Sequence, residues 1–301
     1  NQQVYSQIRI APVISMKHIM ITGCSSGVGK ATALLFSAKG YHVFAGVRRE
    51  EDGQVLIALD SDQNIEPVLL DVTNREQLNE VVNKLEAQLE GHGLDALVNN
   101  AGIAKFVPLE FTSEADIRNI FEVNTMGPVL LTQALLPLLR KATGRIVFVG
   151  SIGGKIAFSF NGPYSISKFA LTGYSDALRR ELAPFGLKVS LLEPGSIDTS
   201  MPEKVREETD AAINELSPEA RSYYESDLRS YAETLPVSKQ YAATPEQAAK
   251  VIAHAVESPR PRAKYLVTPD ARSIAFFNWL LPDRLFDPLL RKMTEWSRLL
   301  S

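Results

Sequence analysis

The sequence has little cysteine, no excess of basic residues and no long apolar run. One cysteine, Cys24, stands among 301 residues, which excludes an internal disulfide and a disulfide-stabilised scaffold. The 32 Lys and Arg residues against 35 Asp and Glu residues leave a formal net charge of −3, which argues against binding to nucleic-acid phosphates. No run approaches the roughly 18 apolar residues of a membrane span, and no basic start of a signal peptide precedes the first apolar segment. We therefore expect a cytoplasmic protein with no nucleic-acid partner.

The composition is that of an ordinary globular protein, with 45% hydrophobic and 22% charged residues, enough for a sizeable core. Short apolar runs alternate along the chain with segments of helical periodicity. This alternation predicts one α/β domain with a doubly wound, Rossmann-type parallel sheet of seven strands, whose ligands lie beyond the carboxyl ends of the strands. The expected strands are 18–22, 42–47, 66–70, 94–99, 145–150, 187–193 and 264–267, and the expected helices are 28–38, 75–89, 114–139, 164–182 and 245–256.

Three segments depart from this alternation. Residues 1–15 read as an N-terminal extension before a domain that spans 16–301. Residues 200–241, rich in Glu, Ser and Tyr, are expected as a substrate lid, with a solvated helical excursion as the alternative. Residues 272–301 form an apolar tail on the substrate side. It packs against the core, covers the pocket or another subunit, or lies on a membrane surface, in that order of expectation.

A glycine-rich turn follows the first expected strand and leads into an apolar helix. Gly23, Gly27 and Gly29 are spaced Gly-x-x-x-Gly-x-Gly. Glycine permits a tight turn and a close approach of the backbone to a pyrophosphate, and the N–H groups at the helix start favour its negative charge. We expect a dinucleotide here, with Ser25, Ser26 and Val28 also in contact. Without the flanking strand and helix the same glycines would read as a structural turn.

The end of the second expected strand indicates which dinucleotide binds. An acidic residue at this point would bind the ribose hydroxyls of NAD, whereas arginine accommodates the extra phosphate of NADP. Arg48 and Arg49 stand there, and with the nearby serine hydroxyls they could hold a phosphate by charge-assisted hydrogen bonds. We expect NADP(H) rather than NAD(H). The alternative is a solvated arginine pair that balances the acidic residues 50–52.

Tyr164 and Lys168 are four residues apart on one expected helix, so their side chains are neighbours. The pKa of a phenol, about 10, is too high for acid/base work at neutral pH, and a nearby ammonium lowers it. Ser151, just after the fifth expected strand, can hydrogen bond the reacting oxygen. These three residues predict proton exchange with an alcohol or carbonyl. Alone, the tyrosine and lysine would read as a solvated pair.

Taken in order, these motifs resemble the short-chain dehydrogenase/reductase family over residues 17 to about 200, and less specifically its 17β-hydroxysteroid and retinol dehydrogenase branch. The resemblance implies that Lys168 also holds the nicotinamide ribose and that Asn124 holds a water linked to Lys168. For some of the further contacts given next, the alternative is structural: a turn at the end of a strand, or a helix cap in the case of Asp71. The further cofactor contacts implied by the resemblance are Asp71, Val72, Asn99, Ala101, Gly102, Pro194, Gly195, Ile197 and Thr199.

The leading hypothesis is therefore an NADP(H)-dependent oxidoreductase that interconverts a carbonyl and an alcohol on a lipophilic, steroid-like or retinoid-like molecule. The alternatives are a 3-oxoacyl-carrier-protein reductase, which would need a basic docking patch, and a cofactor-binding sensor or scaffold without activity. The four histidines are scattered, so no metal site is expected. The helices at 114–139 and after Tyr164 could pair two subunits, so we expect a homodimer or homotetramer.

Overall fold

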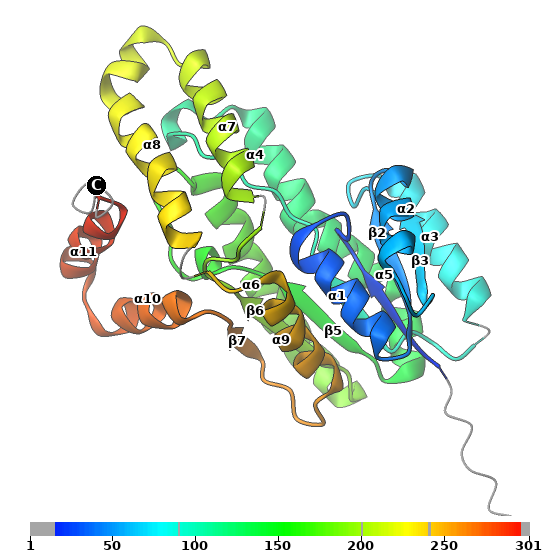
Figure 1. Ribbon diagram of the computed structural model, residues 1–301. Helices are drawn as coiled ribbons and strands as arrows, with labels where there is room; N and C mark the ends of the chain where they lie inside the picture. Colours follow the sequence, from blue (N-terminus) through cyan, green and yellow to red (C-terminus); the bar gives the residue numbers. More distant parts are fainter. Residues whose placement is uncertain (1–15, 90, 200, 240–241, 296–301) are drawn as a thin grey trace, which may run out of the picture.

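The computed structural model describes residues 16–89, 91–199, 201–239 and 242–295, so the expected extension at 1–15 lies outside the described residues. Seven parallel strands form one sheet in the order β3-β2-β1-β4-β5-β6-β7 (Figure 1). Because β1 lies between β2 and β4, the chain reverses direction across the sheet there, which is where such folds bind ligands. The predicted doubly wound parallel sheet is confirmed. The strands are β1 (Lys17–Ile21), β2 (Tyr41–Val47), β3 (Ile65–Leu69), β4 (Ala96–Asn99), β5 (Arg145–Val149), β6 (Lys188–Glu193) and β7 (Lys264–Leu266).

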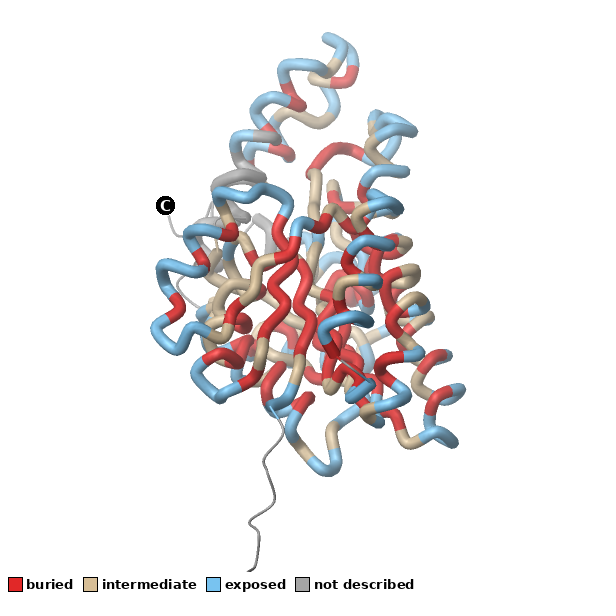
Figure 2. Tube along the Cα trace, turned by 90° about the vertical axis from the view of Figure 1, so that its right-hand side faces the viewer, coloured by how far each residue is buried: buried red, intermediate tan, exposed pale blue. Residues whose placement is uncertain are grey.

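Helices cover both faces of the sheet. Successive strand residues point to opposite faces, and in β1 Met20 packs with the buried residues of α3, α5 and α6, while Ile19 and Ile21 pack with those of α1, α2 and α9. Figure 2 shows these buried residues along the strands and on the inner sides of the helices. The helices are α1 (Gly27–Ala38), α2 (Glu50–Leu59), α3 (Arg75–Gln88), α4 (Glu114–Phe121), α5 (Gly127–Ala142), α6 (Gly162–Leu182), α7 (Met201–Glu215), α8 (Pro218–Lys239), α9 (Pro245–Glu257), α10 (Pro269–Leu280) and α11 (Asp283–Glu295).

The structure corrects two expectations about helices. Helix α2 was not among the expected helices; its first turn carries three acidic residues, which suit the positive end of a helix. The single helix expected over 114–139 is two helices, α4 and α5, joined by a π-helical turn at Glu122–Met126. That turn contains Asn124, whose fully buried side chain is bonded to neighbouring segments.

The insertion after β6 and the C-terminal tail, two of the three segments that depart from the alternation, are helical where the structure describes them. The insertion after β6 forms α7 and α8, which lie beside each other and contact through many residues (Figure 1). In the tail, Ala275 of α10 and Phe286 of α11 pack with Ile152 and Ile156 in a separate apolar cluster. Part of the tail is thus buried against the domain itself. Among the described helices, none is long and apolar enough to cross a membrane.

Candidate active site

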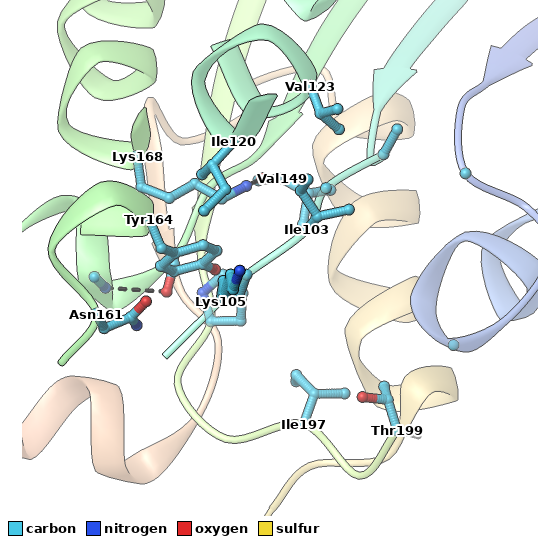
Figure 3. Close-up of a pocket in the computed structure, with 18 of the residues that line it drawn as sticks. Ile103, Lys105, Ile120, Val123, Val149, Asn161, Tyr164, Lys168, Ile197 and Thr199 are labelled. Atoms are coloured by element: carbon cyan, nitrogen blue, oxygen red, sulfur yellow. Dashed lines mark hydrogen bonds between the residues drawn. The ribbon is translucent and has the colours of Figure 1, made fainter. Parts of the chain in front are cut away.

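A cavity of about 1070 Å³ lies at the carboxyl ends of the strands. It extends from the glycine-rich turn and Arg48, past Ser151 and Tyr164, to Leu290 of α11. Figure 3 shows Tyr164 and Lys168 entering it from α6, with Ile197 and Thr199 on the opposite wall. The structure brings together seventeen of the residues predicted from the sequence. Those that line the cavity are Gly23, Ser25, Ser26, Gly27, Val28, Arg48, Asp71, Val72, Ala101, Gly102, Ser151, Tyr164, Lys168, Pro194, Gly195, Ile197 and Thr199.

Four other predicted residues are not part of the cavity wall: Gly29, Arg49, Asn99 and Asn124, the last of which is described below. Gly29 is buried in α1, where an added Cβ would collide with the backbone of Gly23. Asn99 is 2% exposed and donates from Nδ2 to Thr132 Oγ1 at 3.0 Å. The exposed guanidinium of Arg49 turns to Asp52, with Nη2 2.9 Å from Oδ1. Arg49 is thus solvated and paired with an acidic residue, as the alternative interpretation had it. Its position does not support the expected contact with the cofactor.

The glycine-rich turn has the form of a phosphate cradle. Gly23 and Gly27 have φ angles of +70° and +55°, which disfavour other residues. A Cβ at Gly23 would lie 2.9 Å from Ala101 Cα. Ser26, the N-cap of α1, makes no side-chain capping bond, so the first N–H groups of α1 remain available to an anion. These features fit the pyrophosphate of a nicotinamide dinucleotide.

Asn100 joins this turn to the end of β4, a role that was not predicted. Its Nδ2 donates to Thr22 O at 2.9 Å and to Gly23 O at 3.1 Å. In return, Thr22 Oγ1 accepts from the backbone N–H groups of Asn100 and Ala101. These four hydrogen bonds hold two neighbouring loops in register. The sequence Asn99-Asn100-Ala101-Gly102 is consistent with a turn after β4, but it could not show which asparagine would bridge the loops.

Arg48 and Asp71, for which contacts with the adenosine half of the cofactor were expected, both line the cavity. Asp71 Oδ1 accepts from the backbone N–H and the hydroxyl of Thr73 at 2.9 and 2.7 Å. The side chain that caps α3 belongs to Asn74, so the alternative of a helix cap at Asp71 is wrong.

Ser151, Tyr164 and Lys168 meet in the middle of the cavity. The Ser151 hydroxyl is near enough to the Tyr164 phenol to influence its pKa, and Lys168 Nζ lies 5.5 Å from the centre of the Tyr164 ring. The same ammonium donates to Val149 O at 2.9 Å. These contacts come from two adjacent elements, the end of β5 and the first turns of α6. The predicted constellation is therefore present.

The electrostatics of this group differ from the expectation. Burial raises the pKa of Tyr164, and the hydrogen bond from Ser151 lowers it by a smaller amount. Burial also lowers the pKa of Lys168 to about 8. The expectation that Lys168 brings the Tyr164 pKa below its ordinary value is therefore wrong for these side chains alone. Loss of solvent opposes a phenolate and an ammonium alike.

Asn124 approaches this group from behind the cavity wall. It donates from Nδ2 to Ile103 O at 2.8 Å and to Ser167 Oγ at 3.0 Å, and its Oδ1 accepts from Ile103 N at 2.8 Å. A Cβ placed on Gly102 would meet Asn124 Oδ1 at 3.4 Å and Lys168 Nζ at 3.6 Å. The amide and the ammonium thus converge beside Gly102.

Most side chains on the remaining wall of the cavity are apolar, with the charged Lys105, Asp116 and Glu215 among them. This wall takes residues from a loop after β4 and from the segment before α6, which no motif marks in the sequence. It also takes residues from the insertion and the tail, which were expected on the substrate side. Tyr231 of α8 contacts the rings of Phe106 and Phe160, with centroids 5.3 and 6.0 Å apart. Wall residues outside the predicted site set include Ile103, Lys105, Phe106, Asp116, Phe158 and Asn161; Glu215, Tyr231, Ile274 and Leu290 belong to the two segments expected on the substrate side.

Comparison with known proteins agrees with this geometry. The family model described as short chain dehydrogenase matches residues 17–210. The chain belongs to the short-chain dehydrogenase/reductase family. It is 35% identical to 17-beta-hydroxysteroid dehydrogenase type 6 of Rattus norvegicus, over 95% of this chain and 91% of that protein. It is 34% identical to retinol dehydrogenase 5 of Mus musculus, over 90% of this chain and 87% of that protein.

A solved structure described as ElxO with NADP bound superimposes with a TM-score of 0.69 at 29% identity, covering 86% of this chain and 99% of that one. This short-chain dehydrogenase is therefore an oxidoreductase of a family that acts on alcohol and carbonyl groups with a nicotinamide dinucleotide. The resemblance stated from the motifs is confirmed.

Proposed function

We propose that this short-chain dehydrogenase interconverts a carbonyl and an alcohol on a lipophilic small molecule, hydroxysteroid-like or retinoid-like, with NADP(H) as cofactor. One observation carries the proposal. A single cavity joins the phosphate cradle and Arg48 to Ser151 and Tyr164, and continues between apolar side chains such as Ile274. A dinucleotide and an apolar substrate can therefore meet at the Tyr164 hydroxyl.

In this mechanism Tyr164 moves the proton. Its hydroxyl donates a proton to the substrate oxygen during carbonyl reduction, which leaves a phenolate. During oxidation it is the phenolate that accepts the proton of the alcohol. Ser151 hydrogen bonds the same oxygen where charge develops. Lys168 lies beside the phenol and holds the ribose of the cofactor. Asn124 holds a water molecule that links Lys168 to solvent. When bound, the nicotinamide supplies or accepts the hydride.

The preference for NADP(H) rests on the end of β2. Arg48 lines the cavity there, and the β2 strand ends without a carboxylate that could bind the ribose hydroxyls of NAD. The NADP bound by ElxO supports the same cofactor. Of the two arginines, we assign Arg48 to the phosphate, together with the Ser25 and Ser26 hydroxyls, which line the same cavity.

The substrate class rests on the apolar wall and on relatives named as retinol and 17-beta-hydroxysteroid dehydrogenases. We further propose a cytoplasmic homodimer or homotetramer. Ile166 and Phe169 of α6 are 49% and 44% exposed, and such apolar exposure on a helix suits a second copy of this chain.

The test is a panel assay that follows NADPH absorbance with ketosteroids, retinal, simple aldehydes and acetoacetyl thioesters. We expect turnover of a ketosteroid or retinal that exceeds turnover of the thioesters, with Tyr164→Phe as the inactive control. Preferential reduction of the thioesters would instead assign a 3-oxoacyl reductase. NADPH binding without turnover of any member would assign a cofactor sensor.

A further inference from the structure

The start of α10 is bonded to the loop that follows β6. Thr268, the N-cap of α10, is fully buried, and its Oγ1 accepts from the backbone N–H of Gly195 at 2.9 Å. Asp270 Oδ2 accepts from the backbone N–H of Ser196 at 2.9 Å. The backbone N–H groups of two successive loop residues thus donate hydrogen bonds to two side chains that are more than 70 residues further along the chain.

The loop is also in close contact with these side chains. A Cβ on Gly195 would lie 2.6 Å from Thr268 Oγ1 and 2.6 Å from Asp270 Oδ1, which is too close for any residue larger than glycine. Asp270 Oδ1 itself is buried and has no hydrogen-bond partner among the described residues. Removing a carboxylate oxygen from water without a new partner costs free energy. The Thr268 side chain already caps the N-terminus of α10. Helix capping therefore does not by itself explain why Asp270 is buried here.

The loop lies where the reactive half of the cofactor has to bind. At its start, Pro194 O accepts from the backbone N–H of Ile152, the residue after Ser151. At its end, the Thr199 side chain lies against Gly27, with Cγ2 3.2 Å from a Cβ placed there. It therefore runs from the reacting hydroxyls to the phosphate cradle. A dinucleotide with its phosphates at Gly27 must pass along it to bring the hydride position to Tyr164.

Helix α10 also reaches the substrate side of the cavity. Ile274, one turn after Asp270, lines the cavity, and Ala271 and Ala275 pack with Ile152. One rigid element thus contacts both the loop and the apolar wall. The family model ends at residue 210, so this part of the chain lies beyond it.

We infer that Thr268 and Asp270 are positioning residues for the nicotinamide half of the cofactor site. They hold the backbone of Gly195 and Ser196 against α10, and through α10 they link the cofactor loop to the wall of the substrate cavity. This inference rests on the proposed function, because it requires a nicotinamide dinucleotide in the cavity. It assigns to the C-terminal segment a role in cofactor binding rather than in packing alone.

The test compares a whole cofactor with a fragment of it. NADPH reaches both ends of the site, whereas 2′,5′-ADP has the adenosine and its phosphates and lacks the nicotinamide half. Dissociation constants of both are measured by fluorescence or calorimetric titration for the wild type, Asp270→Ala, Asp270→Asn and Thr268→Val, together with melting temperatures. Asp287→Ala, an exposed aspartate on α11, is the matched control.

For Asp270→Ala we expect NADPH to bind about tenfold more weakly or worse, as for the loss of a hydrogen bond to a charged group, while 2′,5′-ADP binds within twofold of the wild type. Asp270→Asn keeps an acceptor oxygen for Ser196 and should recover most of the loss. Asp287→Ala should bind both ligands like the wild type.

Equal weakening of NADPH and 2′,5′-ADP would overturn the inference, because it would indicate a general loosening of the fold. So would unchanged NADPH affinity in both Asp270→Ala and Thr268→Val. If Asp270→Ala does not fold, the comparison of Thr268→Val with the wild type decides in the same way. A wild type that binds neither ligand would refute the proposed cofactor itself, a distinct outcome.

Discussion

Replacing Arg48 tests the cofactor preference, because Arg48 and the adjacent Arg49 have different surroundings in the structure. Arg48 lines the cavity, whereas the guanidinium of Arg49 is bonded to Asp52 at the surface. If Arg48 binds the extra phosphate of NADPH, its loss removes a charge-assisted contact of about 1.5 to 3 kcal/mol. This corresponds to roughly 10- to 100-fold in affinity. NADH lacks this phosphate and should be almost unaffected.

The assay is the ratio of kcat/KM for NADPH to that for NADH, with dissociation constants measured in parallel. Arg48→Ala should lower the ratio at least tenfold, and Arg49→Ala, the matched control, should leave it within twofold. Arg48→Asp should move the preference to NADH by supplying a carboxylate. The neighbouring Val47 does not suit this change, because it is 2% exposed and would bury the charge. A ratio unchanged in Arg48→Ala, or lowered equally in Arg49→Ala, would refute the assignment.

Three further predictions concern catalysis, pH dependence and the tail. Tyr164→Phe should reduce turnover at least a hundredfold and leave NADPH affinity within a few-fold, because it removes the proton carrier and keeps the ring; a smaller loss in steady-state rate would contradict the role. Burial lowers the pKa of Lys168 to about 8, so between pH 8 and its unfolded pKa the unfolded state binds more protons and stability should rise with pH. In denaturant titrations from pH 7 to 10.5, the wild type should therefore gain up to about 3 kcal/mol relative to Lys168→Met, and a constant difference would contradict the shift. Removal of residues 272–301 should lower the melting temperature or weaken substrate saturation, because Phe286 and its neighbours cover Ile152. Full stability and activity with lost binding to liposomes would instead make the tail a membrane anchor.

Much of this protein could be predicted from local patterns. The strands of the sheet are short apolar runs because both faces are buried, and Met20 and its two neighbours on β1 show how alternate residues serve opposite faces. Of the glycines after β1, Gly23 and Gly27 adopt backbone angles that favour glycine, and Gly29 has no room for a Cβ beside the backbone of Gly23. The Tyr164 and Lys168 pair follows from helical spacing. Each of these signals depends on residues close together in the chain, which is why sequence alone could carry them.

Tertiary structure decided what depends on neighbours distant in the chain. Arg48 and Arg49 are adjacent and chemically alike, and only the position of Asp52 and of the cavity separates their roles. The pKa of Tyr164 depends on how much water its surroundings exclude, which the presence of Lys168 four residues away cannot indicate. The bonds from Gly195 and Ser196 to Thr268 and Asp270 join the end of β6 to a helix beyond β7. Side-chain direction, desolvation and contacts across the fold are set only when the whole chain has packed.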